Sequence, residues 1–221
     1  EGEHVIVDLV RCIERGGQLS QVKGIGFRSN GSVILTEPQP LVDVDELPLP
    51  AYHLLPMQKY YFTLLGRFAT VIASRGCPHR CTFCSEWRFW GSRWRQRDPK
   101  KIGDELELLV RRYKVESIWF GDDCFNVSAE MIRGICDEIK SRNLGFNWFY
   151  QGRADLLVEH RDLLPVMRET GNRMVQIGIE ASTDRELEEM NKNQSLDRVA
   201  EAVKLLRDHD IVAQGLIIVG T

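Results

Sequence analysis

Residues 74–85 read SRGCPHRCTFCS, a stretch that holds three of the six cysteines of this 221-residue chain. The three thiols have the spacing C-x3-C-x2-C and belong to Cys77, Cys81 and Cys84. Thiols this close together on one loop can bind a common metal centre. Iron–sulfur clusters are held by cysteine thiolates, usually four of them. Because no fourth cysteine stands nearby, the spacing predicts a cluster with one iron left open for another ligand.

A zinc site is the alternative interpretation of the same cysteines. Structural zinc normally has four tetrahedral ligands, supplied as pairs of Cys or His at short spacing. His79 lies inside the cysteine loop, but the next histidine along the chain is His160. A second pair of ligands is therefore missing around the loop, and the pattern favours a cluster over zinc.

The loop follows the first strand of a regular alternation of strands and helices. We expect strands at residues 69–74, 117–120, 146–151, 174–179 and 211–219. Apolar residues at helical spacing fill the segments between them, and Asp98-Pro99 and Ser195 are N-cap signals for two of the helices. Alternating βα units predict an α/β fold with a parallel sheet, which the pattern leaves either open or closed into a barrel. In both architectures, ligand sites gather at the carboxyl ends of the strands.

Polar residues follow the second and third of these strands. Gly121, Asp122 and Asp123 come directly after the second strand. Paired aspartates at such a position can bind a hard cation, act as a general acid and base, or cap the next helix. Arg153 follows the third strand, where it either clamps a carboxylate bidentately or pairs with Asp155 at the surface.

The fourth strand ends at Glu180, with Ser182 two residues later, and the fifth contains Ile218 within the segment 215–220, GLIIVG. A strand-end glutamate can accept hydrogen bonds from ligand hydroxyls or remain solvated. The fifth segment is also consistent with a simple buried strand. We therefore expect the strand ends, together with the cysteine loop, to form one site.

The cysteine spacing, with the aromatic Phe83 before the last cysteine, resembles the signature of the radical S-adenosylmethionine (SAM) superfamily. In that family the three cysteines hold a [4Fe–4S] cluster, and the amino and carboxylate groups of SAM chelate the remaining iron. The reduced cluster cleaves SAM to methionine and a 5′-deoxyadenosyl radical. The resemblance implies a partial (β/α)6 TIM-like barrel over residues 68–221, truncated at its C-terminal end.

The resemblance also implies a set of SAM-binding residues, namely Phe83, Gly121, Asp122, Asp123, Arg153, Glu180, Ser182 and Ile218. Residues 121–123 resemble the family's Gly-Gly-Glu motif, which binds the methionyl amino group, although this chain has Gly-Asp-Asp there. Glu180 and Ser182 resemble the ribose motif, and the segment around Ile218 resembles the one that packs beside adenine. No catalytic residue is expected beyond the cluster ligands.

The N-terminal part of the chain resembles the end of a Rossmann-like cobalamin-binding domain in cobalamin-dependent members of the family. Asn30-Gly31 between two β-leaning runs predicts a hairpin, and most of the chain's eight prolines lie between residues 37 and 56. We expect three segments: residues 1–36, the remnant of the cobalamin-binding-like domain; 37–67, a Pro-rich linker; and 68–221, the radical SAM core barrel. The chain is expected to be a fragment cut at both ends.

Composition limits the class of protein. Hydrophobic residues make up 43% of the chain and charged residues 28%, with a formal net charge of −3, typical of a soluble globular protein. No run of 18 or more apolar residues occurs, and no secretory signal follows Glu1. We expect a cytoplasmic protein without a membrane span.

Residues 86–97 interleave tryptophans with arginines, a pattern that can stack on single-stranded bases. It can equally line a substrate cavity or cover the cluster, and the acidic net charge makes nucleic acid an unlikely partner. Two alternatives act on or bind RNA: a radical SAM methylthiotransferase, and a zinc-stabilised RNA-binding module that uses this segment.

The resemblance favours a radical SAM enzyme that methylates or rearranges an unactivated carbon in association with cobalamin. The implied cofactors are a [4Fe–4S] cluster, SAM and, by inference from the N-terminal segment alone, cobalamin bound by residues upstream of Glu1. The implied partners are a small-molecule or natural-product-like substrate and a reducing protein such as flavodoxin or ferredoxin.

Overall fold

In the computed structural model, which describes residues 1–220, the chain divides into two units, Glu1–Pro48 and Leu49–Thr221. The first unit contains helix α1 (Glu3–Glu14), the 3-10 turn η1 (Leu19–Gln21) and the strands β1 (Gly26–Ser29) and β2 (Ser32–Leu35). The two strands pair antiparallel, with Asn30 and Gly31 at φ of 48° and 82° in the turn between them. Positive φ at both turn residues is what a two-residue hairpin needs, so the predicted hairpin is confirmed.

The second unit alternates strands and helices, as expected. Its strands are β3 (Tyr61–Phe62), β4 (Gly66–Val71), β5 (Ser74–Arg75), β6 (Arg95–Gln96), β7 (Ser117–Phe120), β8 (Asn147–Gly152), β9 (Asn172–Glu180) and β10 (Val212–Ile217). Its α-helices are α2 (Glu86–Phe89), α3 (Pro99–Glu107), α4 (Ala129–Ser141), α5 (Ala154–Glu159), α6 (Leu164–Glu169), α7 (Asp184–Glu189) and α8 (Leu196–Asp208). Short turns of other helix types are η2 (Tyr52–Leu54), η3 (Met57–Lys59), η4 (Leu108–Arg112), η5 (Phe125–Val127) and η6 (Arg161–Leu163).

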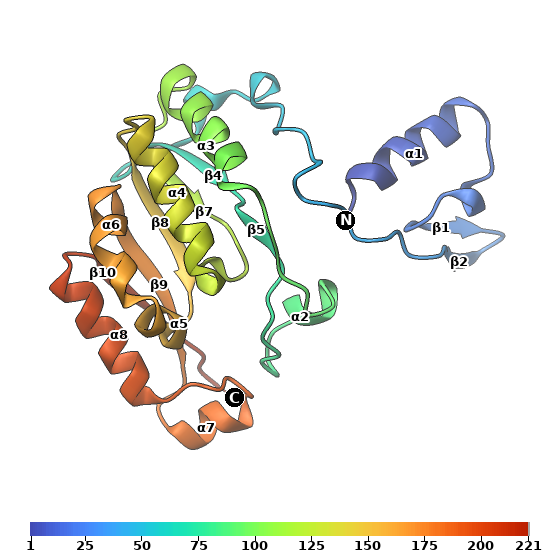
Figure 1. The fold of residues 1–221 in the computed structure, drawn as a ribbon. Helices are drawn as coiled ribbons and strands as arrows, with labels where there is room; N and C mark the ends of the chain where they lie inside the picture. Colours follow the sequence, from blue (N-terminus) through green and yellow to red (C-terminus); the bar gives the residue numbers. More distant parts are fainter. Residues whose placement is uncertain (221) are drawn as a thin grey trace. The chain divides into compact units, whose positions relative to one another are not determined.

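The main sheet has the strand order β10-β9-β8-β7-β4-β3. Neighbouring strands from β4 to β10 pair parallel, and β3 adds an antiparallel edge. Within the described residues the sheet is open and curled, with the larger helices along one face (Figure 1). The sequence pattern left undecided whether the parallel sheet is open or closed. The structure shows an open, curled sheet that corresponds to part of a barrel.

Helix starts follow the predicted caps. The Asp98 carboxylate accepts the backbone N–H of Lys100 at 2.9 Å before α3, and the Ser195 hydroxyl accepts that of Arg198 at 3.3 Å before α8. Both bonds satisfy amides that have no partner within the helix.

The predicted C-terminal boundary of the first strand, residues 69–74, is wrong, because β4 ends at Val71. The Asp122 side chain accepts the backbone N–H groups of Ala73 and Ser74, so these amides are withdrawn from the sheet.

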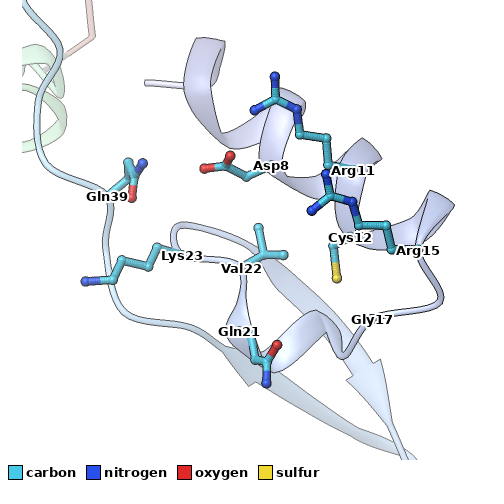
Figure 2. A pocket seen from close by; sticks show the side chains of 9 residues that line it. All are labelled: Asp8, Arg11, Cys12, Arg15, Gly17, Gln21, Val22, Lys23 and Gln39. Atoms are coloured by element: carbon cyan, nitrogen blue, oxygen red, sulfur yellow. The ribbon is translucent and has the colours of Figure 1, made fainter.

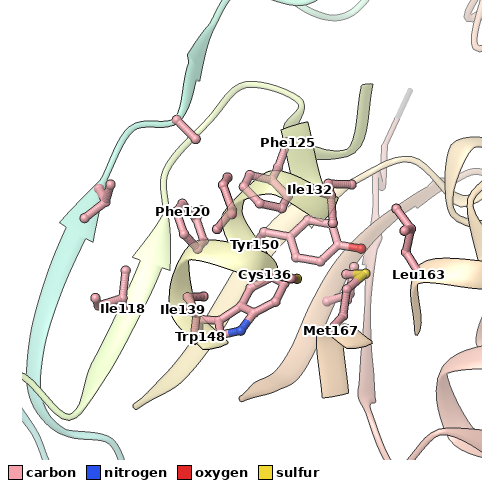
Figure 3. Packing of buried hydrophobic residues seen from close by; sticks show 14 of the residues in the cluster. Ile118, Phe120, Phe125, Ile132, Cys136, Ile139, Trp148, Tyr150, Leu163 and Met167 are labelled. Carbon is pink, nitrogen blue, oxygen red and sulfur yellow. The ribbon is translucent and has the colours of Figure 1, made fainter. Parts of the chain in front are cut away.

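Aromatic side chains fill the core between the sheet and α4. The rings of Phe120, Phe125, Trp148 and Tyr150 lie in mutual contact, with Phe125 and Tyr150 at 4.8 Å between centroids (Figure 3). The Trp148 indole N–H donates to the Thr170 carbonyl at 3.1 Å, so its polar atom is satisfied. This packing holds β7 and β8, whose ends carry candidate site residues, in a fixed register.

The expected linker is partly folded into the second unit. Tyr52 and Met57 are buried in its core, and the Tyr52 hydroxyl donates to the buried Glu105 carboxylate at 2.5 Å. Arg97 pairs with the same carboxylate at 2.6 Å. Burial and the neighbouring carboxylate raise the pKa of Tyr52 well above its usual range.

Candidate functional site

The cysteine loop follows β5 through a tight turn at Gly76. Gly76 has φ +88°, and a Cβ there would collide with the backbone carbonyl of Arg93, so only glycine fits. Cys81 is buried and Cys77 and Cys84 are half-buried; none of the three forms a disulfide. Within residues 1–220, no three His, Cys, Asp or Glu side chains converge on a single-ion position. A four-iron cluster spreads its ligands over a larger volume than one ion does.

The Cys77 thiol has the most activated environment of the three. A hydrogen bond with the Cys124 side chain, opposed by burial and helped by the His79 backbone N–H, lowers the pKa of Cys77 to about 7. Burial raises the pKa of Cys81, while the positive charges of Lys192 and Arg153 act against that effect. Thiolate is the form of cysteine that binds metals.

The segment between α7 and α8 fastens the cysteine loop, a role that sequence reasoning missed. The Met190 carbonyl accepts the Thr82 backbone N–H at 2.9 Å, and the Asn191 side chain donates to the Arg80 carbonyl at 2.8 Å. These contacts join residues more than a hundred positions apart, and no local motif in the sequence marks them.

Lys192, on the same segment, was also missed. Its ammonium lies 2.7 Å from the Glu180 carboxylate in a buried ion pair and 5.8 Å from the centre of the Phe83 ring. Glu180 itself has φ +66°, and its carbonyl accepts the Ile218 backbone N–H at 2.9 Å. Two residues that the sequence singled out, Phe83 and Glu180, thus lie beside a lysine that it did not, and a third, Ile218, bonds to the Glu180 backbone.

Arg153, at the end of β8, is buried and not at the surface as one alternative held. Its guanidinium pairs bidentately with Asp155 at 2.9 Å and donates to the Lys192 carbonyl. Its remaining nitrogen lies 3.9 Å from the Cys81 sulfur. A permanent positive charge therefore stands against the cysteine loop, where it favours thiolate or an anionic ligand.

The two aspartates after β7 have different environments. Asp122 is buried and bonded to Ala73 and Ser74, where the chain passes from β4 to β5, and burial raises its pKa to about 7. Asp123 is half-buried and accepts the Gly76 backbone N–H at 2.8 Å; burial, and next the Glu86 carboxylate, raise its pKa. Asp122 therefore holds two strand ends together, and Asp123 fixes the turn into the cysteine loop.

Gly121 and Ser182, two of the predicted SAM-binding residues, have different surroundings: Gly121 is tightly packed and Ser182 is exposed. A Cβ on Gly121 would stand 2.8 Å from the Thr70 side chain, so the close approach of β7 to β4 needs a glycine here. Ser182 is exposed, and its hydroxyl donates to Glu186 at 3.3 Å beside the capping box of α7.

The Trp/Arg segment packs against the cysteine loop. The Trp87 indole donates to the Cys81 carbonyl at 3.0 Å, and those of Trp90 and Trp94 donate to Glu86 and Ser74. Arg88 lies over the Trp87 ring at 4.9 Å. All three indole N–H groups of the segment are therefore bonded within the protein.

A family model described as the radical SAM superfamily matches residues 71–221, a span that contains the cysteine loop and every predicted site residue. The chain belongs to the radical SAM superfamily. Its radical SAM fold is also seen in the cobalamin-dependent enzyme OxsB with aqua-cobalamin and S-adenosylmethionine bound, with a TM-score of 0.84 at 22% identity over 99% of this chain.

Two further proteins are similar to this chain. The chain is 32% identical over its whole length to the anaerobic magnesium-protoporphyrin IX monomethyl ester cyclase of Rubrivivax gelatinosus, of which it spans 40%. The methyltransferase TsrM of Kitasatospora setae, solved with cobalamin and a [4Fe–4S] cluster, matches 97% of this chain with a TM-score of 0.72 at 17% identity. The chain spans 44% of TsrM and 32% of OxsB.

The donor set of this radical SAM chain fits an iron–sulfur cluster. Three free thiols lie on one short loop, one of them with a lowered pKa, and the Arg153 guanidinium faces another. These are the ligand type and the electrostatic setting that a cluster needs.

The first unit has a cavity of about 570 Å³ of its own (Figure 2). Asp8 and Arg11 of α1 and Arg15 directly after it line the cavity together with Lys23, which pairs with Glu37 at 3.0 Å. None of the predicted cluster or SAM residues lines this cavity.

No helix within the described residues is long and apolar enough to cross a membrane.

Proposed function

We propose that this protein binds a [4Fe–4S] cluster through Cys77, Cys81 and Cys84 and cleaves SAM reductively. The observation that carries the proposal is the gathering of Arg153, Glu180 and Lys192 around the cysteine loop in a chain of the radical SAM superfamily. When bound, the cluster supplies the electron for cleavage of the SAM sulfonium.

The surrounding residues bind and orient SAM. Glu180 accepts hydrogen bonds from the ribose hydroxyls, Phe83 and the Ile218 segment cover apolar parts of the ligand, and Arg153 keeps the site positive. Asp123 and Gly121 shape the strand end beside the methionyl group. Asp122 contributes indirectly, because its oxygens are bonded to Ala73 and Ser74 at the start of β5.

The proposed reaction is methylation or rearrangement of an unactivated carbon in a small-molecule substrate, in association with cobalamin. Likeness to a cyclase, a methyltransferase and a cobalamin-dependent enzyme supports this range. A reducing protein such as flavodoxin or ferredoxin would deliver the electron. The zinc-stabilised RNA-binding alternative has less support, because the indole N–H groups of the Trp/Arg segment on which it depends are bonded internally.

Electron paramagnetic resonance (EPR) of the full-length protein, reconstituted anaerobically and reduced with dithionite, tests the proposal. We expect a reduced [4Fe–4S] signal that changes shape on addition of SAM, together with production of 5′-deoxyadenosine or methylated product. Glu180→Gln should retain the cluster signal and weaken SAM binding about tenfold or more, because a hydrogen bond to a charged group contributes about 1.5–3 kcal/mol.

Glu169→Gln serves as the matched control for the SAM titration. Its carboxylate forms a largely exposed ion pair with Lys140 and lies outside the predicted SAM-binding set, so SAM binding should change little. Zinc without iron after careful reconstitution would overturn the proposal and revive the RNA-binding alternative.

A further inference from the structure

Tyr52 is buried in the core of the second unit, although it belongs to the segment that the sequence predicts as a linker. Nearby residues of that segment, Leu54 and Leu55, are exposed. The Tyr52 hydroxyl donates to Oε1 of Glu105 at 2.5 Å. Because Glu105 lies on α3 and is only 1% exposed, its carboxylate depends on donors from the protein and not on water.

Arg97 continues the contact from Glu105 to residues 72–76, the entry segment, which leads from β4 into the cysteine loop. Arg97 Nη1 donates to Glu105 Oε2 at 2.6 Å and to the Ile72 carbonyl at 2.8 Å. The Arg97 backbone N–H donates to the Ala73 carbonyl at 2.9 Å. Ile72 and Ala73 lie between β4 and β5, outside either strand. Arg97 therefore supplies the donors for two carbonyl groups of the entry segment.

Aspartates from the end of β7 hold the amides of the entry segment. The Asp122 carboxylate accepts the backbone N–H groups of Ala73 and Ser74, and Asp123 accepts that of Gly76 at 2.8 Å. Side chains from outside the segment thus bond to both its amides and its carbonyls. The cysteine loop begins directly after it, so the position of the entry segment sets where the loop begins.

The Tyr52 hydroxyl constrains the orientation of the Arg97 guanidinium. Each oxygen of the Glu105 carboxylate has one of these two residues as its donor. Arginine frequently engages both oxygens of a carboxylate. Without the hydroxyl, Glu105 Oε1 would be a buried acceptor, and Arg97 would turn toward it. Because Arg97 Nη1 also serves the Ile72 carbonyl, that turn would weaken its bond to the entry segment.

We propose that Tyr52 is a positioning residue, whose hydroxyl acts through Glu105 and Arg97 to fix the entry segment in the arrangement that SAM cleavage requires. The inference rests on the proposed function, because it takes the cysteine loop as the cluster site. It gives the linker a part in the reaction, although Tyr52 is outside the predicted cluster and SAM-binding sets. A misplacement of about 1 Å caused by a distant substitution can lower a rate about a hundredfold.

Tyr52→Phe in the reconstituted full-length protein tests the inference, because it removes the hydroxyl and keeps the ring. Hydrogen–deuterium exchange, followed by mass spectrometry, measures how often the backbone amides of residues 73–76 are released. We expect them to exchange about tenfold faster than in the wild type, the effect of losing one hydrogen bond to a charged group. Peptides from α8 should exchange at the wild-type rate.

The rate of SAM turnover per cluster is the measurement that a purely structural role of Tyr52 would not change. We expect Tyr52→Phe to keep the wild-type iron content and KM for SAM, and to lose several-fold in kcat. Such a split means that the lost interaction matters in the transition state and not in the binding of SAM.

Tyr113→Phe is the matched control. The Tyr113 ring lies 6.1 Å from that of Tyr52, but the printed donors to the Glu105 carboxylate are Tyr52 and Arg97. The control therefore removes a hydroxyl from the same part of the core without changing the proposed path. Its exchange rates and its kcat should match those of the wild type.

A double variant tests the path through Glu105. If the hydroxyl acts through this carboxylate, Tyr52→Phe should add little to the effects of Glu105→Gln, because residues in one hydrogen-bond network are not independent. Additive effects would overturn the path.

Unchanged exchange at residues 73–76, or faster exchange throughout the protein, would overturn the positioning role of Tyr52. An unchanged kcat alongside faster local exchange would overturn its part in SAM cleavage. A wild type that holds no iron would instead refute the proposed function, and the exchange rates would then decide by themselves whether Tyr52 holds the entry segment.

Discussion

The Lys192 ammonium and the Glu180 carboxylate form an ion pair with 2.7 Å between Nζ and Oε1, and their side chains are only 7% and 11% exposed. The pair joins the carboxyl end of β9 to the segment before α8. It also stands beside the Phe83 ring of the cysteine loop. A buried charge whose partner is removed has no solvent to compensate it, so each member depends on the other.

Lys192→Met should therefore destabilise the protein strongly. Removal of one member of a buried ion pair costs about 3–5 kcal/mol, because the other charge stays buried and unpaired. Urea denaturation followed by circular dichroism measures the change in the free energy of unfolding. The double variant Lys192→Met/Glu180→Gln should lose less than Lys192→Met alone, since no unpaired charge remains.

Lys140→Met is the control for that series. Lys140 pairs with Glu169 at 2.9 Å, but both side chains are largely exposed, and such surface pairs contribute little. Equal losses for Lys140→Met and Lys192→Met would contradict the importance of burial.

Replacement of any of Cys77, Cys81 or Cys84 by alanine should remove the bound cluster. Three thiolates are the smallest ligand set that leaves one iron open, and two would leave the cluster exposed to loss. Iron and acid-labile sulfide per chain, measured after anaerobic reconstitution, should fall at least several-fold in each variant. Cys12→Ala, in the first unit, should retain the wild-type content. A variant of Cys81 that kept full iron content would show that the loop does not hold the cluster.

Asp122 should make the folded protein less stable as the pH rises, the opposite of the usual effect of a carboxylate. Burial raises its pKa from 3.8 to about 7, so the folded protein keeps a proton that the unfolded chain loses above about pH 4. The associated stabilisation is therefore complete below pH 4 and is lost as the pH rises through about 7. Asp122→Asn cannot titrate. The difference in unfolding free energy, wild type minus variant, should fall between pH 4 and pH 7 in urea titrations; a flat or rising difference would contradict the assignment.

The cysteine loop, the hairpin and the helix caps could be predicted because each depends on residues close together in the sequence. Cys77, Cys81 and Cys84 lie on one turn, and Ser195 caps the helix that it precedes. The parallel strand alternation likewise follows from local apolar patterns. The strand end at Val71 could not be predicted in the same way, since the Asp122 carboxylate that draws away the next amides comes from the neighbouring strand.

The candidate site was only partly predictable for the same reason. Glu180 and Arg153 were found from their positions after strands, but their partners Lys192 and Asn126 were not. The contact of Asn191 with the Arg80 carbonyl spans 111 positions, and no periodicity or spacing encodes it. A position after a strand identifies residues of a site. The groups that hold those residues come from distant elements, and the local sequence of those elements does not indicate the contact.

Asn191→Gly should loosen the cysteine loop without straining the backbone. Asn191 has φ of 50°, a conformation that glycine adopts freely, so the substitution removes the side-chain donor to the Arg80 carbonyl and a longer, exposed contact at 3.4 Å with the Asn193 amide. A hydrogen bond of this kind contributes about 1 kcal/mol, which corresponds to about a fivefold change in an equilibrium. Transfer of iron from the reconstituted protein to a chelator, followed by absorbance, should therefore be about fivefold faster than in the wild type. Asn143→Gly is the control, because Asn143 has the matching backbone conformation, with φ of 50°, and is exposed after α4. Its rate of iron loss should stay near the wild-type value, and equal acceleration in both variants would mean that general flexibility of the chain, and not the Arg80 contact, governs retention of the cluster.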